Sequence, residues 1–96
     1  MRVHLRSEAE ADIEGAARWY ERQRGDLGDE FLDEVSMAVA AISDNPRLYP
    51  VVHRNTRRAL IHRFPFGIYY RVEEEAIIVI AVMHGSRHPK RWQKRT

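Results

Sequence analysis

The sequence contains no cysteine, and it has no long hydrophobic run. Without cysteine there is no disulfide, no thiolate nucleophile and no cysteine-based zinc or iron–sulfur site. The longest apolar run, Ala76 to Met83, is far shorter than the ~20 residues of a membrane-spanning helix. The first residues also lack the apolar segment of a signal peptide. We therefore expect a cytoplasmic protein that makes no membrane contact.

The glycines and histidines form no recognisable chemical motif. The glycines are scattered and match neither a phosphate-binding loop nor a dinucleotide-binding pattern. His84 and His88 are four residues apart, but Gly85 and Pro89 disfavour a helix that would bring them together. A single domain of 96 residues also has too small a core for a deep cofactor pocket. We expect neither a metal nor a cofactor.

Charge is distributed unevenly along the chain. Residues 1–45 carry 5 Lys and Arg against 11 Asp and Glu, a net charge of −6, whereas residues 46–96 carry 11 against 3, a net charge of +8. This polarity is typical of a protein with an acidic partner, such as a nucleic acid or an acidic protein segment. The alternative is that the two halves attract each other within the fold.

The first half of the chain has helical periodicity. Residues 2–6 alternate as in a short strand, and Ser7 with Glu10 matches a capping box at a helix start. Gly25 is expected to cap the end of this helix, whose acidic residues should face solvent. A second helix is expected to start at residues 26–29 and to end at 45–46, with a loop over 46–56.

The second half has a period of two. Strands are predicted at 58–64, 66–73 and 76–83, and the last of these is apolar on both faces, as in a central strand. Residues 84–96 form a basic tail without periodicity, and no internal repeat is visible. The order β-α-α-β-β-β predicts an α+β domain over 1–96, with the helical hairpin packed on a small antiparallel sheet.

Most of the basic residues belong to the predicted sheet and tail. We expect them to gather into one concave surface on the sheet face away from the helices, where guanidinium groups would bind phosphates or carboxylates. Trp92 lies among them, and two roles are open: it folds back onto the core, or it stacks on a base. The basic residues are Arg57, Arg58, Arg63, Arg71, Arg87, Lys90, Arg91, Lys94 and Arg95.

The motifs of the second half resemble a known family. The segment RRALIHRFPFGIYYRVEEEAIIVIAVMHGSRHPKRW is similar to the C-terminal half of RelE/ParE superfamily toxins, and in particular to the ParE-like, plasmid-stabilisation branch. AEADIE, WYE and NPRLYP in the first half also fit. The final motif, H-G-x-R-x-P-x-x-W, is here His84, Gly85, Arg87, Pro89 and Trp92.

The resemblance implies the toxin of a type II toxin-antitoxin system. Such a toxin is neutralised by a cognate, ParD-like antitoxin, which wraps a flexible segment along the helical hairpin and sheet. The antitoxin contacts implied here are Trp19, Tyr20, Phe31 and Val35.

Two targets are open. ParE-like members poison DNA gyrase by trapping it with cleaved DNA, which requires no catalytic residue. On this hypothesis, Arg87→Ala and Trp92→Ala are expected to abolish trapping and to leave the fold intact. The expected target contacts are Arg58, Arg63, Arg71, His84, Arg87, His88, Arg91 and Trp92.

RelE-like members are instead ribosome-dependent mRNA endoribonucleases, which need no metal. Their arginine in the penultimate strand corresponds to Gly67 here, and their C-terminal tyrosine corresponds to Gln93. A nuclease of this sequence would depend on His84, Arg87, Arg63 and Arg71. A third reading is a family member that has lost toxicity and only binds a partner.

Overall fold

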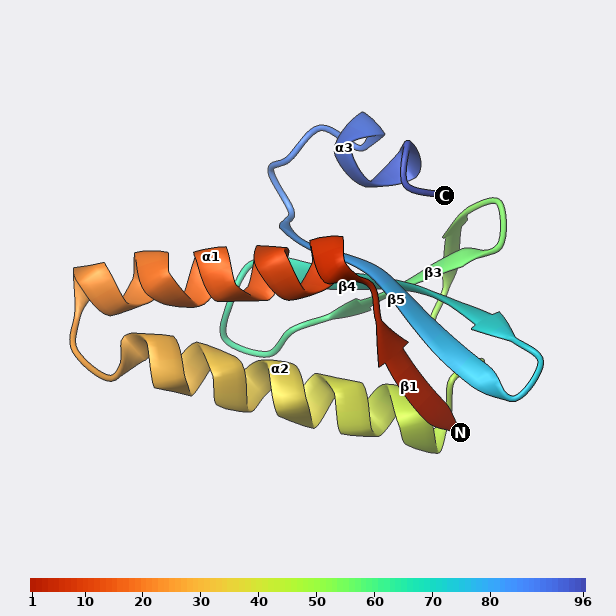
Figure 1. The fold of residues 1–96 in the computed structure, drawn as a ribbon, viewed down its shortest axis with the longest axis horizontal. Coiled ribbons are helices and arrows are strands. Elements are labelled where there is room, and N and C mark those ends of the chain that lie inside the picture. The colour runs from red at the N-terminus through yellow and green to blue at the C-terminus, as the bar shows by residue number, and fades with distance from the viewer.

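A computed structural model describes residues 1–96. Figure 1 shows α1 and α2 as an antiparallel pair running beside a twisted sheet, with the short α3 at a separate place near the C-terminus. Neither the long helices nor α3 combine the length and apolar character that crossing a membrane requires. The elements are β1 (Arg2–Leu5), α1 (Ser7–Gln23), α2 (Leu27–Asp44), β2 (Val51–His53), β3 (Thr56–Leu60), β4 (Phe66–Glu73), β5 (Ala76–His84) and α3 (Lys90–Gln93).

The strands form one sheet in the order β1-β5-β4-β3-β2. Strands β2 to β5 form an antiparallel meander, and β1 pairs in parallel with β5. The α+β fold predicted from the sequence is confirmed, but the sheet is mixed rather than purely antiparallel. Because β5 is apolar on both faces, it occupies an inner position, and β1 covers the first half of its second edge.

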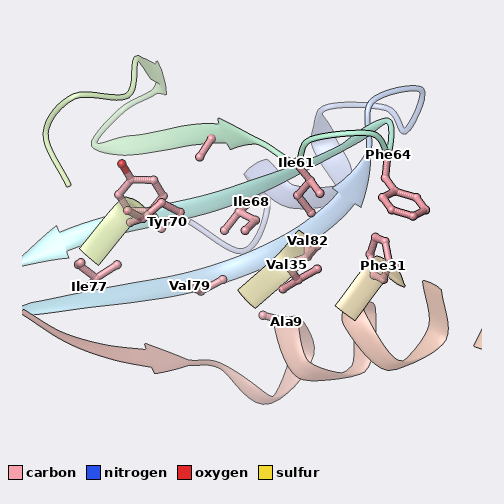
Figure 2. Close-up of a cluster of buried hydrophobic side chains, with 12 residues drawn as sticks. Ala9, Phe31, Val35, Ile61, Phe64, Ile68, Tyr70, Ile77, Val79 and Val82 are labelled. Atoms are coloured by element: carbon pink, nitrogen blue, oxygen red, sulfur yellow. The ribbon is translucent and has the colours of Figure 1, made fainter. Parts of the chain in front are cut away.

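The main core lies between the helical hairpin and one face of the sheet (Figure 2). Phe31 and Val35 of α2 point toward the sheet and meet residues of β4 and β5, among them Ile68 and Val82. The Tyr70 hydroxyl donates a hydrogen bond to the Pro46 carbonyl oxygen at 2.6 Å, and burial raises the pKa of this phenol. The helical periodicity of the first half is confirmed, because Phe31 and Val35 lie on the face of α2 that packs on the sheet.

A bulge in β5 creates a second, smaller cluster on the outer face of the sheet. The pairing shifts between Tyr69 and Tyr70, so that Ile80 has no partner in β4. Ile80 and Ala81 consequently both lie on the outer face, where they pack with Tyr69 and Trp92. The end of β5 is thereby turned relative to its beginning.

The predicted helix caps at Ser7 and Gly25 are wrong. The Arg6 N–H is bonded to the Val79 carbonyl oxygen, and Ser7 is already helical, so its side chain caps nothing. At the other end of α1 the left-handed residue is Asp26, with φ of 71°, rather than a glycine. The reason is Glu21, whose carboxylate accepts the N–H groups of Asp26 and Gly28 and so fixes the turn.

Two irregular segments also differ from the prediction. The expected loop over 46–56 contains β2, and the expected strand over 58–64 is shifted to Thr56–Leu60. Arg63, which has a positive φ of 72° and pairs with Glu30 of α2, lies outside the sheet. The expected irregular tail contains α3, which folds against the outer face through Trp92.

Candidate functional site

A groove of about 1040 Å³ runs along one side of α1. Small residues of α1, Ala11, Gly15 and Ala16, leave this space open, and the opposite side is formed by the end of β5 and the segment that follows it. The lining combines apolar and basic side chains. It comprises Ala11, Asp12, Gly15, Ala16, Trp19, Tyr20, Arg22, Pro65, Phe66, Val82, Met83, His84, Ser86, Arg87, His88, Arg91 and Arg95.

Asp12 and Arg95 join α1 to the C-terminus at one end of this groove. The Arg95 guanidinium donates to both Asp12 carboxylate oxygens, at 2.7 and 3.3 Å, and to the Ile80 carbonyl oxygen at 3.2 Å. Asp12 also accepts the Val82 N–H, and Arg6 donates to the Arg95 carbonyl oxygen. The bonds to the Val82 N–H and the Ile80 carbonyl oxygen thus pair backbone groups of β5 that lie beyond the end of β1.

Trp92 fixes the C-terminal segment to the outer face of the sheet. Its ring stacks on Tyr69 with centroids 4.4 Å apart, and only 5 % of the residue is exposed. Of the two roles left open by the sequence, the structure has Trp92 folded back onto the core. We therefore expect Trp92→Ala to destabilise the fold rather than to leave it intact, because the change removes a buried aromatic stack.

The segment after β5 repeats one hydrogen-bond pattern twice, first in a turn and then at the start of α3. In His84–Arg87 the Arg87 N–H donates to the His84 carbonyl oxygen, and in His88–Arg91 the Arg91 N–H donates to the His88 carbonyl oxygen. In each unit the ring Nδ1 of the histidine accepts a backbone N–H two residues later, from Ser86 at 3.0 Å or from Lys90 at 3.2 Å. We call these two units the His–Arg turns.

The hydrogen bonds of the His–Arg turns fix the role of each imidazole ring. In this arrangement Nδ1 of both histidines accepts a backbone N–H, and Nδ1 of His84 also lies 2.8 Å from the Ser86 hydroxyl oxygen. The ring proton of the neutral side chain therefore lies on Nε2 in both residues. Each turn thus offers an imidazole N–H and an arginine guanidinium, both of which are hydrogen-bond donors.

The predicted single basic surface does not form, because several arginines have structural partners. Arg63 pairs with Glu30 at 2.8 Å on the helical side of the molecule, and Arg71 pairs with Glu73 at 2.9 Å. Arg57 donates to the backbone of the loop before β2, and the carbon chain of Arg58 lies over Gly67. None of these four arginines lines the groove.

Three arginines of the groove have no carboxylate partner. Arg22, Arg87 and Arg91 take part in no ion pair, and all three are exposed. The single carboxylate of the lining, Asp12, is already paired with Arg95. The groove therefore has an uncompensated positive charge that suits an anionic ligand.

The four hairpin residues predicted to contact an antitoxin divide into two pairs. Trp19 is 52 % exposed and lines the groove beside the half-buried Tyr20, whose phenol pKa is raised by burial. Phe31 is fully buried and Val35 is 6 % exposed, and both belong to the main core (Figure 2). A partner docked on the folded protein can thus reach Trp19 and Tyr20 but not Phe31 or Val35.

Sequence reasoning missed Asp12, Arg22 and Arg95 as groove residues. The acidic residues of α1 were expected in solvent, yet Asp12 bonds to Val82 and Arg95 across more than 60 positions of sequence. Arg22 had a local signal, because it lies one helical turn after Trp19. No group of three or more potential metal ligands is present in residues 1–96.

A comparison with family models identifies the family of the chain, and a comparison with solved structures supports its fold. Residues 3–89 match the family model described as the ParE toxin of the type II toxin-antitoxin system parDE. The chain is also similar to a solved structure described as the chromosomal ParDE toxin-antitoxin system from P. aeruginosa, with a TM-score of 0.67 and 19 % identity. That similarity covers 88 % of this chain and 95 % of the other, and at this identity it shows the fold alone. No curated protein sequence matches significantly.

Proposed function

Because the chain belongs to the ParE family of toxins from type II toxin-antitoxin systems, we propose that it poisons DNA gyrase and that a cognate antitoxin neutralises it. As a poison it would trap gyrase on cleaved DNA. The toxin would need no reaction of its own, only a surface that binds the gyrase–DNA complex.

The observation that carries this proposal is the set of hydrogen-bond donors on the two His–Arg turns, which we call the rim of the groove. Arg87 and Arg91 are exposed and unpaired, and the histidine beside each one has its Nδ1 engaged by the backbone. A general base needs a free acceptor nitrogen, whereas binding an anion needs only donors. The rim is therefore suited to binding a charged target rather than to abstracting a proton.

The nuclease alternative has less support. A Cβ atom at Gly67, the position of the nuclease arginine, would lie 3.1 Å from the Cγ and Cδ atoms of Arg58. An arginine at position 67 would thus require Arg58 to move. Arg63 and Arg71 are outside the groove that holds His84 and Arg87, so the four proposed nuclease residues do not line one cleft.

The antitoxin is proposed to occupy the interior of the same groove. Trp19 and Tyr20 offer an aromatic surface, and the unpaired arginines suit an acidic segment. Of the predicted antitoxin contacts, Trp19 and Tyr20 are retained. An antitoxin bound there would cover Arg22 and the rim arginines, which accounts for neutralisation by simple competition.

A gyrase cleavage assay with matched variants tests the proposal. Purified toxin is mixed with gyrase, ATP and supercoiled plasmid, and linear DNA is quantified after denaturation. Arg87→Ala is expected to reduce linear DNA about tenfold or more, because it removes a charge-assisted contact. Arg47→Ala, an exposed arginine outside the groove, serves as the control and should behave as wild type. Equal cleavage by both variants would exclude Arg87 as a target contact.

A further inference from the structure

The two His–Arg turns share one hydrogen-bond pattern and are adjacent in the chain, and the second leads into α3. Each spans four residues, HGSR and HPKR, and each is closed by a bond from the arginine N–H to the histidine carbonyl oxygen, at 3.0 and 2.9 Å. In both turns the histidine Nδ1 accepts the N–H of the third residue. The same hydrogen-bond pattern thus recurs around the same pair of residue types twice in succession.

Both turns are free to bind. Arg87, His88 and Arg91 are exposed, and neither arginine is in an ion pair. His84 is half-buried against Phe66, with ring centroids 5.4 Å apart, and it lines the groove. The neutral imidazole and the guanidinium of each turn supply donors for the two unshared oxygens of one phosphodiester.

We propose that the His–Arg turns bind two backbone phosphates of one DNA strand, one phosphate per turn. Two donor sets of the same composition, four residues apart, suit a polymer with one anion on every residue, which describes a nucleic acid strand better than a protein segment with scattered carboxylates. The inference rests on the proposed function, in which the target is gyrase holding cleaved DNA. It states that the two turns contact the DNA of this complex rather than gyrase itself.

The segment is anchored firmly enough to act as a binding element. Trp92 follows the second turn directly and is stacked on Tyr69, and Arg95 is tied to Asp12 and to the Ile80 carbonyl oxygen. The turns are therefore held between the end of β5 and a fixed C-terminus. Because the conformation exists before binding, little ordering is required when phosphate binds.

The test measures binding of the free toxin to a fluorescein-labelled 20-base-pair DNA duplex by anisotropy, without gyrase, over a range of salt concentrations. Two phosphate contacts predict a slope of about −1.8 in log K against log salt. Arg87→Ala and Arg91→Ala should each weaken binding about tenfold at low salt and reduce the slope by about 0.9. His84→Gln, which keeps a donor, should weaken binding less than His84→Ala.

Controls separate this inference from the proposed function. Arg47→Ala should leave both affinity and slope unchanged, and unaltered melting temperatures should show that each variant is folded. A slope that neither Arg87→Ala nor Arg91→Ala changes would overturn the inference. So would tighter binding to an RNA duplex or to a polyglutamate peptide than to DNA. If the variants lose gyrase poisoning while DNA binding is absent in wild type, the rim contacts gyrase itself and the proposed function stands without the inference.

Discussion

At the scale of single residues, partners that are distant in sequence decide what each charged side chain does. Arg63 was expected to face a target, but it bonds to Glu30 across the molecule. Asp12 was expected in solvent, but it binds Arg95 and the backbone of β5. Residue type and local spacing carry no information on such pairs. Arg87 and Arg91 keep their expected exposure because they follow the last strand, where no acidic element packs over them.

The Glu30–Arg63 pair predicts a measurable titration. The hydrogen bond from Arg63 is the largest cause that lowers the pKa of the Glu30 carboxyl below its ordinary value. A hydrogen bond from Arg24 lowers this pKa further. A lowered pKa in the folded state adds stability above the unfolded-state pKa, and this stability is lost as the pH falls through the folded-state pKa. By carbon-detected NMR, Arg63→Ala should raise the Glu30 midpoint. Arg18→Ala, which disturbs only an exposed pair with Glu14, should leave it unchanged. A midpoint at the ordinary value in wild type would contradict the pair.

At the scale of elements, the sequence predicts those helices and strands whose apolar residues recur at a regular spacing. The two long helices and the strands over 66–73 and 76–84 agree closely with the structure, because their apolar residues repeat with a clear period. The helix caps, β2 and α3 were missed. Their positions depend on Glu21 bonding to the next helix, on pairing with β3, and on the stack of Trp92 with Tyr69. None of these contacts leaves a local periodic signal.

The contact between α1 and α2 predicts opposite effects at two glycines. A Cβ at Gly28 would lie 2.6 Å from the Ala17 carbonyl oxygen, whereas a Cβ at Gly15 would meet nothing within 4 Å. Gly28→Ala should therefore lower the free energy of unfolding by about 1–3 kcal/mol. Gly15→Ala, inside α1, should raise it by about 0.5–1 kcal/mol. Urea unfolding of both variants checks this, and a stabilised Gly28→Ala protein would refute the close packing.

The C-terminal segment is predicted to be part of the folding unit. Trp92→Ala removes a side chain that is 5 % exposed and stacked on Tyr69, so it should cost about 3 kcal/mol of unfolding free energy. Arg91→Ala, one residue earlier and exposed, is the matched control and should change stability by less than about 0.5 kcal/mol. Equal stability of the two variants in urea would mean that α3 does not pack on the sheet in solution.

At the scale of the whole molecule, the uneven charge reflects in part the attraction between the two halves of the chain. Ion pairs between the acidic first half and the basic second half, such as Asp12–Arg95 and Glu30–Arg63, account for part of it. Two unpaired arginines of the basic half, Arg87 and Arg91, line the groove together with Arg22 of α1, and no carboxylate balances them there. Composition predicts that a basic surface exists, but only the fold identifies which arginines are left to form it.

Binding of the antitoxin should stabilise the toxin. A ligand that binds only the folded state at a hundred times its Kd adds about 2.7 kcal/mol, which for a domain of this size raises Tm by about 10 °C or more. Differential scanning fluorimetry of toxin with and without antitoxin measures this shift. Trp19→Ala should reduce it, because Trp19 is an exposed groove residue in the proposed interface. A Tm that antitoxin does not change would argue against docking on the folded toxin.

The most direct test of the central claim compares the two possible targets with one preparation of toxin. One sample receives gyrase, ATP and supercoiled plasmid, and the other receives translating ribosomes with a defined mRNA, each with and without antitoxin. Our account predicts linear DNA in the first sample, its loss on adding antitoxin, and intact mRNA in the second. Cleaved mRNA together with fully supercoiled or relaxed, unbroken plasmid would contradict it and identify the protein as a ribosome-dependent nuclease.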